Sequence, residues 1–119
     1  MSFKKLKYKT SAFDMDLEFG HTYEDKLREL FQNKGKIEVK ADRMAHETGN
    51  ITIEFECRGK PSGISTTEAD YWFYWIAEKD TGIMIAVSRL KEICEGKKVV
   101  NGGDDKAAKM YLIPVGEIL

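Results

Sequence analysis

The segment 36–42 carries three charged side chains spaced two residues apart, Glu38, Lys40 and Asp42. Ile37, Val39 and Ala41 alternate with them, which is the pattern of a half-buried β-strand. Alternate residues of a strand share a face, so the three charged side chains are expected to form one row. The segment 51–57 alternates in the same way, and the short connection predicts an antiparallel pair that brings Glu54 and Glu56 to that row.

Carboxylates grouped with a lysine are suited to metal-dependent phosphodiester hydrolysis. Mg²⁺ prefers oxygen ligands, typically one or two carboxylates with waters and phosphate oxygens. The metal acidifies a water and offsets charge in the transition state, and a nearby lysine stabilises developing negative charge. An ordinary surface strand also alternates charges, because opposite charges favour cross-strand pairing. The Glu-x-Lys spacing alone does not separate these two interpretations.

A further carboxylate, Glu24, lies in the first turn of a helix predicted over 22–33. Tyr23, Leu27, Leu30 and Phe31 follow the helical period, and Glu24 flanks the apolar seam that they form. Glu24 is therefore a candidate for the same site. The alternative is a carboxylate placed there because it interacts favourably with the helix dipole.

The elements around these residues predict the order β-α-β-β-α-β-α-β, a mixed sheet flanked by helices in one α/β domain over 1–119. Residues 12–19 alternate apolar and acidic side chains and predict a half-buried strand, with 6–10 as its partner. Gly20 is expected to end that strand, and Thr22 to cap the helix that Gly35 stops.

The aromatic run 71–75 is assigned to a second helix over 67–78, capped by Thr66 or Thr67 and buried on most sides. We expect an interior strand over 82–87, a short helix over 88–95 and a mobile glycine-rich loop over 101–105. A final strand over 109–113 and a helical turn over 115–119 follow.

Composition excludes several classes of protein. The chain has 119 residues, of which 42% are hydrophobic and 33% charged, as in ordinary soluble domains. No stretch approaches the roughly 20 apolar residues of a membrane span, so a cytoplasmic protein without a membrane partner is expected. The net charge of −1 means that nucleic-acid binding would depend on local basic clusters. Cys57 and Cys94 form no CxxC pair, which argues against structural zinc.

The loop 58–65 and the helix start predicted after it are the candidate contact with a nucleic-acid backbone. Backbone amides and hydroxyls at a helix N-terminus suit phosphate oxygens. The candidate residues are Arg58, Lys60, Ser62, Ser65 and Thr67. An ordinary capped loop would have the same composition. The aromatic run 71–75 has two interpretations as well, stacking on bases or packing in the core.

The order of the predicted elements and the text IEVKADRMAHETGNITIEFECRGKPSGISTTEADYW resemble the PD-(D/E)XK nuclease superfamily, especially small phage-type and Holliday-junction-resolvase-like members. The core of that superfamily runs helix, three-stranded antiparallel meander, helix, strand. The resemblance assigns its helix glutamate to Glu24 and its (D/E)xK motif to Glu38 and Lys40.

The resemblance implies a DNA endonuclease that depends on Mg²⁺ or Mn²⁺, resolvase-like on branched DNA, in the cytoplasm of a bacterial or phage-infected cell. Glu38 and Glu24, with Asp42 or Glu54, would hold the metal, and Lys40 would assist the attacking water. Resolvase-like members act as homodimers, so a homodimer is expected. The alternatives are a non-catalytic nucleic-acid-binding or assembly module on the same fold and an unrelated small α/β protein.

One departure from the superfamily pattern concerns the aspartate that usually precedes the (D/E)xK motif. No strand or aspartate fits between the predicted helix and Glu38. Asp42, Glu54, or one of Asp14 and Asp16 would have to replace it, or the site is degenerate. A second register would give Glu38 the aspartate's role and Glu54 the motif position, with the lysine displaced to Lys40.

Overall fold

The computed structural model describes residues 12–32 and 36–118. The chain divides into two units, residues 1–34 and 35–119, which are described one at a time. The first contains α1 (Ala12–Gln32), a helix of 21 residues. The second contains seven strands and two further α-helices among the described residues, so the α/β class expected from the sequence is confirmed.

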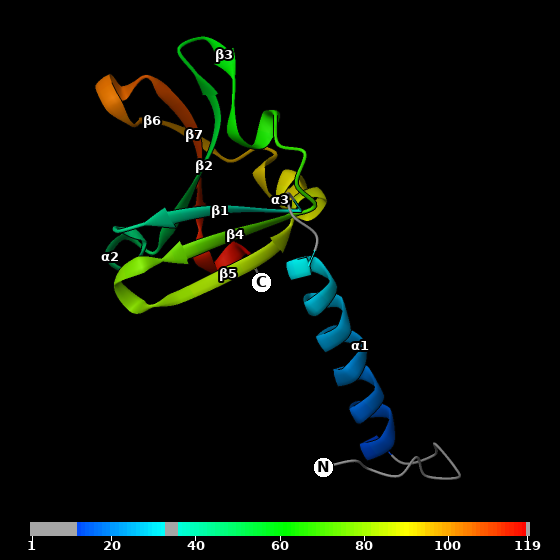
Figure 1. Ribbon diagram of the computed structural model, residues 1–119. Helices are drawn as coiled ribbons and strands as arrows, with labels where there is room; N and C mark the ends of the chain where they lie inside the picture. Colours follow the sequence, from blue (N-terminus) through cyan, green and yellow to red (C-terminus); the bar gives the residue numbers. More distant parts are fainter. Residues whose placement is uncertain (1–11, 33–35, 119) are drawn as a thin grey trace. The chain divides into compact units, whose positions relative to one another are not determined.

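The first sheet of the second unit contains β1 (Ile37–Asp42), β4 (Tyr71–Ile76) and β5 (Thr81–Ala86). The central strand β4 pairs in parallel with β1 and antiparallel with β5. Figure 1 shows the three strands side by side. The face that carries Trp72 and Tyr74 is buried, whereas Val39 on the other face of β1 is 56% exposed.

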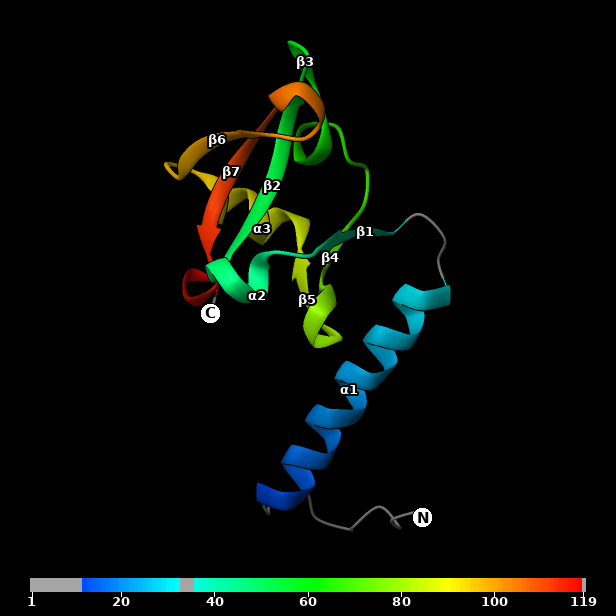
Figure 2. The same cartoon turned by 90° about the vertical axis from the view of Figure 1, so that its left-hand side faces the viewer.

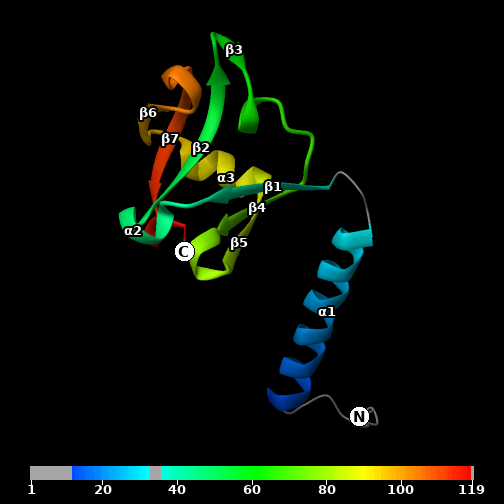
Figure 3. The same cartoon turned by 60° about the vertical axis from the view of Figure 1, so that its left-hand side comes forward.

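The second sheet is antiparallel, with the order β3-β2-β7-β6, and is set at an angle to the first (Figures 2 and 3). Its strands are β2 (Asn50–Cys57), β3 (Lys60–Pro61), β6 (Lys98–Gly102) and β7 (Ala108–Pro114). The register between β2 and β7 shifts between Glu54 and Glu56. Such a β-bulge bends a strand and redirects its side chains.

The core joins the two sheets and α3 (Val87–Cys94). Its largest fully buried side chains come from four elements and are Trp72, Ile51, Ile53, Leu90 and Ile113. Each such aliphatic side chain contributes roughly 1.5–3 kcal/mol through burial. Figure 2 shows α3 beside both sheets, where Leu90 and Ile93 reach the shared core.

The strand predicted over 12–19 is wrong, because these residues form the first part of α1. Met15 and Phe19 continue the four-residue spacing of Tyr23, Leu27 and Phe31, so the helical period extends back through the alternating segment. Gly20 lies inside the helix, where glycine costs about 1 kcal/mol but is tolerated. The partner strand predicted over 6–10 and the stop at Gly35 lie outside the described residues.

The predicted N-cap at Thr22 is also wrong. Its Oγ1 donates a hydrogen bond to the Glu18 carbonyl at 2.9 Å, as hydroxyls inside helices often do.

The helix predicted over 67–78 is wrong, because residues 71–76 form β4. An apolar run without polar interruptions fits a buried strand as well as a buried helix by periodicity alone. Aromatic and β-branched side chains favour strands, and pairing on both edges adds to that preference. Trp72 and Tyr74 face the core, and Trp75 on the opposite face is exposed.

The predicted antiparallel pairing of segments 36–42 and 51–57 is wrong as well. Both segments form strands, but β1 pairs with β4 and β2 pairs with β7. The helix α2 (Ala45–Thr48) lies between them and ends at Gly49 in the left-handed region, at φ +72°. The chain therefore leaves the first sheet before β2 begins, and the predicted row of charges is divided between two sheets.

The strands predicted over 82–87 and 109–113 and the helix predicted over 88–95 are confirmed as β5, β7 and α3 within one residue or two. The final helical turn is a 3₁₀ helix over Val115–Glu117. The strand β6 lies partly in the segment predicted as a glycine-rich loop. Because 12–32 is one helix, 71–76 is a strand and β6 is an additional strand, the order of elements differs from the predicted one.

Candidate functional site

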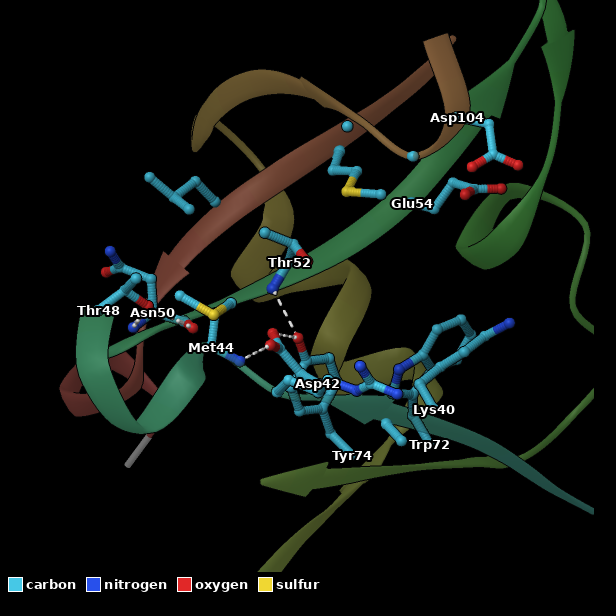
Figure 4. Close-up of a pocket in the computed structure, with 16 residues that line it drawn as sticks. Lys40, Asp42, Met44, Thr48, Asn50, Thr52, Glu54, Trp72, Tyr74 and Asp104 are labelled. Atoms are coloured by element: carbon cyan, nitrogen blue, oxygen red, sulfur yellow. Dashed lines mark hydrogen bonds between the residues drawn. The ribbon is translucent and has the colours of Figure 1, made fainter. Parts of the chain in front are cut away.

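A groove of about 1050 Å³ lies where the two sheets diverge. Its walls come from β1 and β4 on one side, and from β2, β7 and the turn after β6 on the other. Among the side chains that line it, Figure 4 shows Lys40, Asp42, Thr52, Glu54, Trp72, Tyr74 and Asp104. Lys40, Asp42 and Glu54, three of the residues expected from the sequence to form one site, therefore line one groove.

At the joint of the two sheets the Tyr74 hydroxyl donates a hydrogen bond to Oδ2 of Asp42 and accepts one from the Thr52 amide at 3.2 Å (Figure 4). The hydroxyl therefore links β4 to β1 within one sheet and to β2 in the other. Burial and the hydrogen bond to Asp42 raise the pKa of Tyr74 from 10 to about 12. Tyr74 is 2% exposed and stays protonated at neutral pH.

The other oxygen of Asp42 begins the turn into α2. Oδ1 accepts hydrogen bonds from the amides of Met44 at 2.6 Å and Ala45 at 3.2 Å. A carboxylate offers about four acceptor positions, and three of those of Asp42 are occupied by the chain itself. Asp42 therefore acts first as a structural residue that fixes the corner between β1 and α2.

Lys40 lies against an aromatic wall of the groove. Its Nζ is 5.8 Å from the centroid of the Trp72 ring, within the range of a cation–π interaction. Lys40 is an exposed residue, whereas Trp72 is 1% exposed. This contact holds the positive charge of Lys40 beside the groove.

Glu38 lies on the same face of β1 as Lys40, two residues earlier, and is outside the set of residues that line the groove. Its Oε1 accepts a long hydrogen bond of 3.4 Å from Thr67 Oγ1. The same hydroxyl oxygen accepts the amide of Ala69 at 3.2 Å. Thr67 therefore organises the chain before β4 and contacts Glu38, a role that differs from the helix cap predicted for it.

Two carboxylates occupy the end of the groove away from α2, Glu54 on β2 and Asp104 in the 3₁₀ helix Asp104–Lys106 (Figure 4). Glu54 lies at the β-bulge, after which Glu56 pairs with Lys109 at 3.4 Å. Sequence reasoning missed Asp104. The signal for it was an acidic pair directly after two glycines, of which Gly103 adopts φ +70°.

The remaining candidate residues are dispersed around the second sheet and α1. Arg58 lies 3.9 Å from Asp105, and Lys60 is exposed on the short strand β3. Ser65 Oγ and the Ser62 amide both donate to the Phe55 carbonyl, at 2.8 and 3.1 Å.

The two serines therefore hold the 3₁₀ helix Gly63–Ser65 against β2. Glu24 is an exposed residue of α1, in the other unit.

Across residues 12–32 and 36–118, no three histidine, cysteine, aspartate or glutamate side chains gather closely enough to hold a metal ion. Within the same ranges no helix is long and apolar enough to cross a membrane. Comparison of the chain with protein-family models, with curated proteins and with solved structures gives no match.

Proposed function

We propose that the protein is a divalent-metal-dependent DNA endonuclease that acts in the groove between the two sheets. The observation that carries the proposal is that Lys40, Glu54 and Asp104, from three separate elements, line one groove. A lysine and carboxylates from separate elements are the groups that phosphodiester hydrolysis uses. The proposal includes membership of the PD-(D/E)XK superfamily, a restriction-endonuclease-like core and a resolvase-like preference for branched DNA. These three parts rest on the text of residues 36–75.

The donor chemistry of Glu54 and Asp104 fits Mg²⁺ or Mn²⁺. Mg²⁺ sites often use one or two carboxylates and complete the coordination with water and substrate phosphate. A third acidic ligand from the described part of the chain is therefore not required once DNA is bound. When bound, the metal would acidify a water and offset the charge of the transition state.

The chain's own cations would act on the phosphate. Lys40 is held over Trp72 at 5.8 Å and would stabilise negative charge as it develops on a phosphate oxygen. Arg43 also lines the groove and would bind a neighbouring phosphate, because its planar donors match phosphate oxygens. Glu38 lies next to Lys40 along the strand, where it would bias the orientation of the ammonium group.

A second candidate function is a nucleic-acid-binding or assembly module without catalysis. Two observations favour this candidate. Asp42 has committed three of its acceptor positions to the chain, and the described residues contain no cluster of three potential metal ligands. In such a module Lys40 and Arg43 would bind phosphates, and affinity would fall steeply as salt increases.

Calorimetric titration with Mg²⁺ and with Mn²⁺ tests the metal site. Glu54→Gln and Asp104→Asn are expected to abolish binding, and Glu56→Gln is the matched control because Glu56 pairs with Lys109 outside the groove. If the free groove binds metal too weakly to measure, the titration is repeated with uncleavable DNA present. Equal binding by all four proteins would place the metal elsewhere and contradict the proposal.

Cleavage assays on branched and linear DNA separate the two functions. The endonuclease predicts metal-dependent cleavage that Lys40→Ala, Glu54→Gln and Asp104→Asn each reduce at least about a hundredfold, as expected for loss of one transition-state contact. DNA binding in EDTA without cleavage in either metal would support the binding module instead. Absence of both DNA binding and cleavage would contradict both functions.

A further inference from the structure

One face of the second sheet forms a wall of the groove. The register pairs Thr52 with Leu112 and Glu54 with Met110, and residues paired in this way point to the same face. All four line the groove, whereas the opposite face of the same strands packs into the core. The wall is therefore polar along β2 and apolar along β7.

The apolar part of this wall is open to a ligand. Met110 and Leu112 are only partly buried, and neither belongs to the hydrophobic side chains that pack against the core. Gly102 on β6 leaves space for the Met110 side chain, because a Cβ there would lie 3.1 Å from its sulfur. The flexible thioether of methionine adapts to irregular surfaces and contacts aromatic rings favourably. The two side chains therefore suit a flat ring.

Several polar side chains of the groove are not used by the chain itself. Arg43 makes no ion pair, and the side-chain amide of Asn50 makes no hydrogen bond, with the described part of the chain. The Lys40 ammonium group lies over the Trp72 ring and pairs with no carboxylate of that same part. The groove therefore offers two cations and one amide to a ligand.

The cations and the apolar side chains belong to different walls. Lys40 lies on β1 and Arg43 directly follows that strand, whereas Met110 and Leu112 belong to β7 in the other sheet. Between them runs β2, which meets the first sheet at Thr52 and pairs with β7 along its other edge (Figure 4). A ligand that fits both walls has negative charge along one side and apolar rings along the other.

A single strand of nucleic acid has this division between its two sides. Grooves that bind single strands combine cations along the phosphate backbone with side chains against which the bases pack. In a duplex the bases are paired and stacked, so a base must leave the stack before a pocket can hold it. An acidic peptide would supply the negative charges but no flat ring beside each of them.

We propose that the groove holds an unpaired segment of DNA, with its phosphates on Lys40 and Arg43 and its bases against Met110 and Leu112. The amide of Asn50, which offers both a donor and an acceptor, would bind the edge of one base. This inference rests on the proposed function, in which the groove is the DNA site, and it names the form of DNA that the groove accepts.

Fluorescence anisotropy on the full chain tests the proposal with labelled, uncleavable oligonucleotides of about 10 nucleotides. Ca²⁺ is present because it takes oxygen ligands and offsets the charges of Glu54 and Asp104, which would otherwise repel phosphate. The probes are an intact single strand, the same strand with abasic sites, and the same strand paired with its complement. The abasic strand and the duplex are each expected to bind at least about tenfold more weakly than the intact strand.

Two substitutions test the surface assigned to the bases. Leu112→Thr is expected to weaken binding of the intact strand about fivefold or more and to leave binding of the abasic strand unchanged. Met110→Gln keeps the length of its side chain and should act in the same way, so a folding defect in one variant does not decide the test. Val99→Thr is the matched control, because Val99 pairs with Tyr111 and faces the other side of the same sheet.

A third substitution tests the surface assigned to the phosphates. Arg43→Ala is expected to weaken binding of the intact and the abasic strand by the same factor and to reduce the dependence of affinity on salt. A factor that differs between the two strands would place Arg43 at a base and contradict the arrangement.

An abasic strand or a duplex that binds as tightly as the intact single strand would overturn the proposal. So would a loss of affinity in Leu112→Thr that is equally large with the abasic strand. These outcomes are separate from catalysis. Metal-dependent cleavage of duplex DNA with no dependence on unpaired bases would support the endonuclease and overturn this inference. Binding that depends on the bases, by a chain that cleaves no DNA, would support this inference and contradict the catalytic function.

Discussion

Replacing Tyr74 with phenylalanine would remove one hydroxyl that three strands share. The hydroxyl donates to the Asp42 carboxylate and accepts the Thr52 amide, and it lies at the joint between the two sheets. A hydrogen bond to a charged group contributes about 1.5–3 kcal/mol, and a buried amide left without a partner costs about 1–3 kcal/mol. The surroundings of Thr52 are only partly buried, so water offsets some of the second cost.

The expected loss for Tyr74→Phe is therefore about 2–4 kcal/mol in the free energy of unfolding. For a chain of this length that corresponds to a fall in Tm of about 8–15 °C. Urea unfolding followed by circular dichroism measures the free energy, and calorimetry measures Tm. An unchanged m-value would show that the variant unfolds from the same compact state.

Tyr111→Phe is the matched control. Tyr111 stacks on Phe55 with ring centroids 4.3 Å apart, and its hydroxyl makes no hydrogen bond to the described residues. Its replacement should change stability by less than about 0.5 kcal/mol, as for most substitutions that remove no contact. A Tyr74→Phe variant as stable as this control would refute the view that the hydroxyl joins the two sheets.

Three further predictions concern titration, backbone strain and thiol reactivity. Burial raises the pKa of Tyr74 to about 12, so the stabilisation that the protonated hydroxyl gives is complete below pH 10 and is lost between pH 10 and 12. Ultraviolet titration of tyrosinate should show one late group that Tyr74→Phe removes. A normal titration of all tyrosines would contradict this. Gly63→Ala should destabilise the fold by more than about 3 kcal/mol, because the new Cβ would lie 2.1 Å from a backbone carbonyl oxygen. In the control Gly49→Ala the new Cβ meets open space, so the cost should be only the roughly 1–2 kcal/mol of a left-handed backbone. Equal losses in urea unfolding would show that the close approach at Gly63 is relieved. Burial raises the pKa of the Cys94 thiol to about 11, so maleimide at neutral pH should label the half-buried Cys57 first, and mass spectrometry showing Cys94 labelled at the same rate would contradict its burial.

The candidate site could be predicted in part. The sequence grouped Lys40, Asp42 and Glu54 on the basis of a strand pairing that does not occur, and the groove brings them together from two different sheets instead. Asp104 joins them through a turn whose position depends on β6 and β7. The structural role of Asp42 was not predicted, because it depends on Tyr74, which lies 32 residues away in sequence.

The sequence by itself determined where most strands and the helix α3 lie, because their periodicity is local and survives any arrangement of the chain. It did not determine the identity of the segments 12–19 and 71–76, since alternating and continuous apolar runs are compatible with more than one period. Strand pairing and the groove depended on tertiary structure, because both depend on contacts between residues distant in sequence. Burying Trp72, Ile53 and Ile113 in one core fixes which sheet each strand joins, and thereby which charges meet.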